Sequence, residues 1–241
     1  MPARVWRFES SLGHHFKNVL SVAANTTTER TFRPVIAVKI PSNELLAVLT
    51  ATSFAAGLNV YATVATLGLL AHAGVLALPP ALHVLASWYV IACSAALFVV
   101  EFFADKIPVF DLLWNALHTF VRIPIAALLA YGATAQLSAG SQLLATLLGG
   151  VIALVAHSGK TAVRAAVTPS PEPFSNMALS LGEDALAVFL TWFATSHPFW
   201  AATMALTLVL VFVVLMRLVV RALRSVWRRT RKQFDLITNA V

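Results

Sequence analysis

Charged residues are scarce in this chain of 241 residues. Asp, Glu, Lys and Arg together make up 11% of it, whereas 59% of the residues are hydrophobic. The mean hydropathy is +0.81, far from the composition of a soluble domain. The composition therefore excludes a soluble globular protein and predicts an integral membrane protein.

Cysteine is almost absent as well. Cys93 is the only one, which excludes an intramolecular disulfide and any metal site built from several thiolates. The sequence also has no HExxH, no GxSxG and no phosphate-binding glycine loop. We therefore expect no metal and no cofactor, and the weak enzyme signatures make catalysis the less favoured kind of function.

Positive charge is concentrated at the two ends of the chain. Thirteen of the 17 Lys and Arg residues lie before Ser42 or from Arg217 onward, while residues 44–216 hold seven acids against four bases. The formal net charge of +7 thus predicts basic tails held by anionic lipid, with no nucleic-acid partner. We expect a polar basic tail at 1–43, a transmembrane helical domain at 44–220 and a basic cytoplasmic tail at 221–241.

Six apolar stretches approach or exceed the roughly 20 residues that cross a bilayer. The expected spans are Leu45–Ala71, Leu82–Val100, Asp111–Tyr131, Leu143–Val167, Met177–Phe193 and Phe199–Met216. The predicted fold class is all-α, a polytopic membrane protein of about six transmembrane helices. The division into three plus three spans suggests an inverted repeat, as in many transporters.

The connections between these spans differ in charge. Lys106 lies between the second and third spans, and Lys160 and Arg164 lie towards the connection between the fourth and fifth, whereas the other connections carry no Lys or Arg. Basic loops stay on the cytoplasmic side of a membrane. We therefore expect both termini on the cytoplasmic side of the membrane.

The first expected span is uncharged but carries polar side chains. Thr52, Asn59 and Thr63 recur at helical spacing, and such groups hydrogen-bond across packed helices. We interpret them as packing contacts and not as substrate contacts. Gly57 and Asn59 mark a place where this helix could loosen, because glycine weakens a helix and asparagine competes for backbone groups.

A polar stripe runs through the third expected span. Its members fall at i, i+4, i+7 and i+11, which is one narrow helical face. They are Asp111, Asn115, His118 and Arg122. An arginine inside an apolar span needs a partner or a solvated cavity, and we expect Glu101, Glu183 or Asp184 to neutralise Arg122.

Other ionisable groups lie in the inner halves of the neighbouring spans, and we expect them to converge with this stripe. The fifth span repeats the pattern with Asn176, Ser180 and Glu183 at i, i+4 and i+7. The predicted substrate or ion pathway consists of Glu101, Asp105, Lys106, Asp111, Asn115, His118, Arg122, His157, Lys160, Arg164, Asn176, Ser180, Glu183 and Asp184.

Two interpretations of this cluster remain open. It is either a buried ion-pair network that pins the helices together, or a polar pathway in which carboxylates and histidines exchange protons and a base holds an anion. The second predicts a small transporter or channel for a polar or anionic solute, with protons as the coupling ion. The alternatives are an enzyme acting on a lipid head group and a non-catalytic scaffold subunit, and the oligomeric state, a homo-oligomer included, stays open.

Three segments of the chain resemble a bacterial membrane family known as a domain of unknown function, DUF-4126. They are AAGLNVYAT at 55–63, VEFFADKIPVFDLLWNALHTFVR at 100–122 and HSGKTAVRAAVTPSPEPFSNMALSLGED at 157–184. The resemblance covers roughly Leu45 to Met216 and implies a polytopic membrane protein, so the expected location is a bacterial cytoplasmic (inner) membrane. It implies no established activity, but its matching positions include most of the charged residues of the predicted pathway.

Overall fold

Helices make up nearly all of the structure. The computed structural model describes residues 38–104, 108–167 and 173–238, which belong to the unit Ile36–Val241. The elements are β1 (Val38–Lys39), α2 (Leu45–Leu58), α3 (Val60–His72), β2 (Leu76–Ala77), the 3₁₀ helix η1 (Pro80–Ala86), α4 (Trp88–Ala104), α5 (Pro108–Ala133), α6 (Ala139–Val167), α7 (Pro173–Ser196) and α8 (Pro198–Thr238). This confirms the predicted all-α class of polytopic membrane protein.

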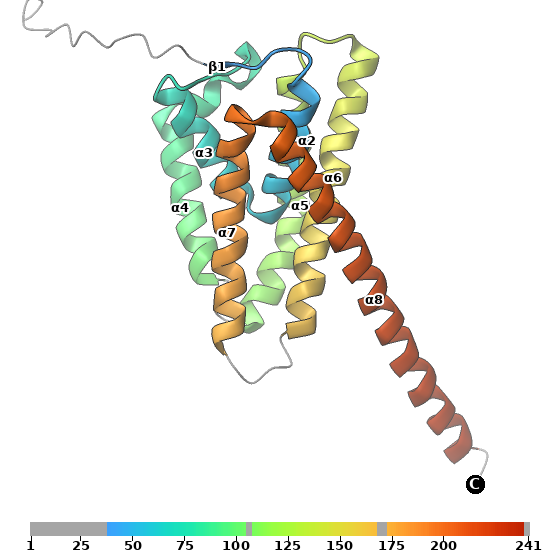
Figure 1. The fold of residues 1–241 in the computed structure, drawn as a ribbon. Coiled ribbons are helices and arrows are strands. Elements are labelled where there is room, and N and C mark those ends of the chain that lie inside the picture. Colours follow the sequence, from blue (N-terminus) through green and yellow to red (C-terminus); the bar gives the residue numbers. More distant parts are fainter. Residues whose placement is uncertain (1–37, 105–107, 168–172, 239–241) are drawn as a thin grey trace, which may run out of the picture. The chain divides into compact units, whose positions relative to one another are not determined.

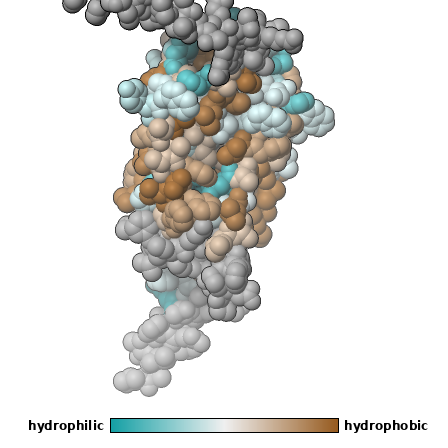
Figure 2. Space-filling model, turned by 90° about the vertical axis from the view of Figure 1, so that its left-hand side faces the viewer, coloured by the Kyte–Doolittle hydropathy of each residue, from teal (hydrophilic) through white to brown (hydrophobic). Residues whose placement is uncertain are grey.

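Four of these helices are long and apolar enough to cross a membrane. Their candidate spans are Ala116–Ala133, Ala139–Arg164, Met177–Ser196 and Pro198–Ser225. The pair of η1 and α4, bent by 63°, is a fifth candidate. Large apolar side chains such as Phe120, Leu144 and Leu210 are exposed on these helices, and Figure 2 shows apolar side chains over the middle of one face. Apolar surface of this extent calls for a lipid environment.

The structure differs from the sequence prediction in the first span. Residues 45–71 do not form one helix, because Asn59 is extended (φ −148°, ψ 104°) between α2 and α3. The side-chain oxygen of Asn59 accepts a hydrogen bond from the backbone N–H of Ala62 at 2.9 Å, which is an N-cap that starts a new helix. The weak point expected at Gly57 and Asn59 is thus confirmed.

The helices α2 and α3 form a re-entrant hairpin. The strand β1, which precedes α2, pairs in parallel with β2, which follows α3, so the two arms begin and finish at the same end of the unit. Figure 1 shows α2 running from that end into the bundle and α3 returning to it. Arms of 14 and 13 residues measure only about 20 Å each, less than the roughly 30 Å of a hydrocarbon core. The tip of the hairpin therefore lies inside the bundle.

This hairpin changes the expected topology. The prediction that both basic tails lie on one side rested on one continuous first span. A hairpin removes that crossing, and β1 and the C-terminal end of α8 lie at opposite ends of the unit (Figure 1). Residues 1–37 themselves lie outside the described part, and the suggested inverted repeat stays a prediction.

The central element of the bundle is α2. Of its residues only Leu46 is exposed and Thr52 is half-buried, and it packs on α5, α6, α7 and α8. Glycine permits the closest of these contacts, since a Cβ added to Gly57 would lie 2.5 Å from the backbone oxygen of Ala153. The tip of the hairpin is thereby held against α6.

Candidate functional site

The hairpin tip is bound to two long helices by side chains. The amide nitrogen of Asn59 donates to a carboxylate oxygen of Asp184 on α7 at 2.8 Å. From α6, the ammonium of Lys160 donates to the backbone oxygen of Leu58 at 3.2 Å. This oxygen belongs to the C-terminal end of α2, where the helix dipole is negative and favours a cation. The tip is thus joined to one acid and one base.

A chain of ion pairs extends on either side of this base. Arg122 of α5 pairs with Glu101 of α4, and Glu101 lies 3.8 Å from Lys160. Lys160 in turn lies 3.2 Å from Glu183 of α7, which also accepts a hydrogen bond from Arg164 at 2.7 Å. Four consecutive helices, α4 to α7, therefore share one line of alternating charges.

The alternating charges are almost completely removed from solvent. The side chains of Glu101, Arg122 and Lys160 are fully buried, and that of Glu183 is 11% exposed. With Asp184, the described cluster holds three carboxylates against the three bases Arg122, Lys160 and Arg164. Such balance is required, because an uncompensated buried charge is costly.

Two polar atoms of the Glu101–Arg122 pair are less well satisfied. The second carboxylate oxygen of Glu101 and the Nε of Arg122 are buried without a hydrogen-bond partner among the described residues. Buried polar groups are usually paired, and an unmade hydrogen bond costs about 1–3 kcal/mol or more for a charged group. The Glu101–Arg122 pair is therefore the place where the cluster could accept a further polar group.

His157 extends the network from α6. Nη1 of Arg122 lies 2.9 Å from Nδ1 of His157, and because a guanidinium only donates, Nδ1 must accept. Nε2 of the ring then carries the proton and donates to the hydroxyl of Thr119 at 2.8 Å. This arrangement requires a neutral His157, whose protonation would break its bond with Arg122.

His118 connects the hairpin with α5 on a separate line. Its Nδ1 lies 2.7 Å from the backbone oxygen of Trp114, which can only accept, so Nδ1 carries a proton. Nε2 lies 2.9 Å from the hydroxyl of Tyr61 on α3, and this hydroxyl donates to Nε2 when the ring is neutral. A tyrosine and a histidine in direct contact can pass a proton, so this pair is a candidate relay.

The structure brings most of the predicted site residues together. Glu101, Arg122, His157, Lys160, Arg164, Glu183 and Asp184 form the network described above, His118 lies beside it, and Ser180 is buried one turn before Asp184. Of the three acids proposed as partners of Arg122, Glu101 is the one that pairs with it. The helices α5 and α7 are linked through Glu101 and Lys160, and Arg122 does not face lipid.

Other predicted site residues lie outside the described part of the structure. Asp105 and Lys106 fall in the undescribed segment 105–107. The side chains of Asp111, Asn115 and Asn176 are likewise not described, although α5 and α7 include these positions. No group of three His, Cys, Asp or Glu side chains that could hold a metal ion occurs among the described residues.

Sequence reasoning missed three members of the network. Asn59 was interpreted as a packing residue, and Tyr61 and Thr119 were not singled out. The signal for Asn59 was present, since an amide next to a glycine-containing stretch in an uncharged run marks a helix break. Tyr61 and Thr119 carried no such signal, because one aromatic and one hydroxyl side chain on apolar helices are ordinary.

Residues 46–218, more than two thirds of the chain, match the family described as domain of unknown function DUF4126. The chain belongs to this family, and the matched region contains the hairpin and every member of the charge network. No curated protein and no solved structure matches the chain.

Proposed function

We propose that this protein is a small membrane transporter that moves an anionic solute together with protons past the tip of the α2–α3 hairpin. The observation that carries the proposal is a helix broken in the bundle interior, with the backbone ends at the break buried among charged side chains. Discontinuous helices whose ends meet substrate and coupling ions near the bilayer middle are the building principle of many transporters.

The charge balance of the cluster supports a coupling rule. Three bases and three carboxylates compensate one another when the histidines are neutral. A proton on Glu183 would leave one positive charge uncompensated at Lys160 and Arg164, both of which contact this carboxylate. One monovalent anion would restore the balance, so protonation and anion binding are linked through the cost of a buried net charge.

Each member of the cluster has a role in this scheme. Glu183, whose side chain is the most accessible of the ion-paired carboxylates, accepts the proton. Lys160 and Arg122 hold the anion, and the Tyr61–His118 pair relays protons. In this scheme the arrangement in which carboxylates engage the bases is closed to the anion.

We place the arginine-bearing end of α8 on the cytoplasmic side of a bacterial inner membrane. Arg217, Arg221, Arg224 and Arg228 are exposed on α8, whose 41 residues extend for about 60 Å. Each basic residue near an anionic membrane surface contributes about 1 kcal/mol to the attraction between the protein and that surface. On this orientation the β1 end of the unit faces the opposite side of the membrane.

The test is flux into proteoliposomes. Purified protein is reconstituted with an internal pH dye, and a proton gradient is applied with chloride, nitrate or phosphate outside. We expect anion-dependent proton entry in the wild type, loss of flux in Arg122→Ala, and anion entry without proton entry in Glu183→Gln. Gly182→Ala, next to Glu183 but with no atom near its added methyl, is the control and should transport normally.

Normal coupled flux in both Arg122→Ala and Glu183→Gln would contradict the scheme. The second candidate is a scaffold in which the cluster only joins helices. The observation that favours it is that each of the three bases is paired with a carboxylate, so that the cluster has no net charge. A scaffold predicts no flux in the wild type with any anion, while the same two variants still lose stability. Thermal unfolding of each variant in detergent, measured beside the flux, separates the two candidates.

A further inference from the structure

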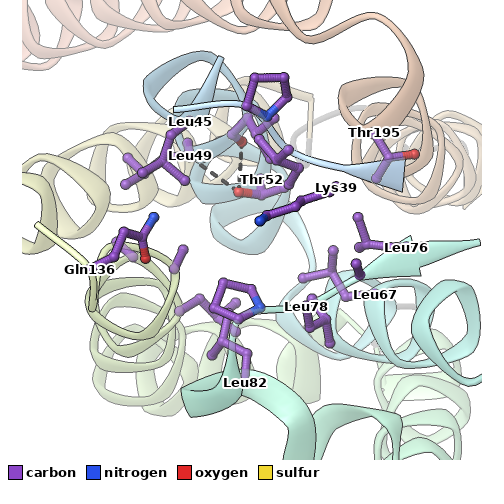
Figure 3. A pocket seen from close by; sticks show the side chains of 18 of the residues that line it. Lys39, Leu45, Leu49, Thr52, Leu67, Leu76, Leu78, Leu82, Gln136 and Thr195 are labelled. Atoms are coloured by element: carbon purple, nitrogen blue, oxygen red, sulfur yellow. Dashed lines mark hydrogen bonds between the residues drawn. The ribbon is translucent and has the colours of Figure 1, made fainter. Parts of the chain in front are cut away.

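A pocket of about 750 Å³ opens at the base of the hairpin, far from the charge network along the arms. Five separate segments enclose it: the stretch from β1 into α2, the last turns of α3, the segment from β2 to η1, the end of α5 with its following turn, and the end of α7. Its walls are built mainly from leucine, proline and alanine side chains (Figure 3). A pocket of this size and composition is typical of a small-molecule site.

One charged group lies among the lining residues. Figure 3 shows the side chain of Lys39 crossing the pocket, with its ammonium directed toward the side where Gln136 lies. Among the residues that the structure describes, no acid lines the pocket and the side chain of Lys39 has no hydrogen-bond or ion-pair partner. The hydroxyl of Thr52 is already bonded to the backbone oxygen of Val48 at 2.8 Å. Lys39 therefore offers an anion a cation that no described residue pairs with.

We propose that this pocket binds an anionic amphiphile with a single alkyl chain. The carboxylate or phosphate head lies against Lys39 and the amide of Gln136, while the chain lies among Leu45, Leu49 and Leu67. Charge complementarity fixes the head group, because a cation beside an apolar cavity favours an anion with an apolar body. This inference does not rest on the transport proposal, since none of the charge-network residues lines the pocket.

The experiment measures displacement of a fluorescent fatty acid from the full-length protein in phosphatidylcholine nanodiscs. The competitors are decanoate, decyl phosphate, decanol and decyltrimethylammonium. Both anions should compete, and the neutral and cationic chains should be weaker by about tenfold or more, the worth of a charge-assisted hydrogen bond. Stronger competition by decyl phosphate points to a lysolipid head group, and stronger competition by decanoate points to a free fatty acid.

Two variants locate the site. Lys39→Gln should reduce the affinity for decanoate to that for decanol, whereas Arg224→Gln, an exposed base on α8, should change nothing. Ala133→Phe places a ring in the pocket and should abolish competition by all four chains. The proposal is overturned if decanol competes as well as decanoate, if either pocket variant binds normally, or if only a two-chain anionic phospholipid displaces the probe.

Discussion

The two ends of the α2–α3 hairpin place charged side chains in opposite environments. At the tip, Leu58 and Asn59 are bound by side chains from α6 and α7 within an almost fully buried network. At the base, β1 and β2 meet through a two-residue ladder and cover an apolar pocket with one cation, Lys39, that pairs with no described residue. A charge in the interior must be paired because water cannot reach it, whereas Lys39 at the surface is solvated. Hydrogen bonds and ion pairs are therefore concentrated at the tip, whereas the pocket lies at the base.

The largest effect that separates the two ends is expected at the tip, from Glu101→Gln. Replacing this acid leaves Arg122 as a buried guanidinium without its anion, and breaking a buried pair in this way typically costs about 3–5 kcal/mol. The measurement is the free energy of unfolding in detergent, followed by SDS titration.

The control for this prediction is the double variant Glu101→Gln with Arg122→Met, which removes both charges. It should recover part of the lost stability, since replacing a buried ion pair by apolar or neutral groups is often close to neutral. If the single variant is as stable as the wild type, the guanidinium is hydrated and the tip is not the closed interior described here.

A medium effect is expected from Gly57→Ala. The added methyl would lie 2.5 Å from the backbone oxygen of Ala153 and 2.7 Å from the Cβ of Ala156, so α2 must move away from α6. Overpacking of this kind costs about 1–3 kcal/mol. The matched control is Gly182→Ala in α7, where no atom lies within 4 Å and the higher helix propensity of alanine should raise stability slightly. Equal melting temperatures for the two variants would contradict the close contact.

The smallest effects compare two threonines on the two arms. Thr63, fully buried near the tip, donates to the backbone oxygen of Asn59 at 2.9 Å, so Thr63→Val should cost about 1 kcal/mol. Thr52 makes the same kind of bond, to the backbone oxygen of Val48 four residues earlier, but it is only half-buried at the pocket, so Thr52→Val should stay within about 0.5 kcal/mol. Thermal unfolding of both variants checks the order, and a larger loss for Thr52→Val would reverse the comparison of tip and base.

Much of the candidate site could be predicted from the sequence. Helical spacing and the cost of burying charge were enough to group Glu101, Arg122, Lys160 and Glu183, because each lies on an apolar helix where only another polar group can satisfy it. Which acid meets which base was not predictable, since pairing depends on the rotation and depth of each helix. The three acids proposed for Arg122 were therefore equivalent until the helices were placed.

The sequence failed most clearly at the first span. Residues 45–71 are uncharged and long enough to cross a membrane, so length and hydropathy alone favour one continuous helix. Asn59 indicated a weak point, but a local break does not say whether the chain continues forward or turns back. The pairing of β1 with β2 gives the answer, and it changes the expected number of crossings between the two basic tails.

By itself the sequence determined that this protein folds in a membrane and which charged residues it must bury, because both follow from composition and from helical spacing. Only the tertiary structure decided that α2 and α3 form a hairpin, that its tip enters the charge network and that its base encloses a pocket. These features depend on contacts between segments far apart in the chain, such as Asn59 with Asp184 and Val38 with Leu76. The local pattern of residues does not indicate which distant residue will pair with a given polar group or strand.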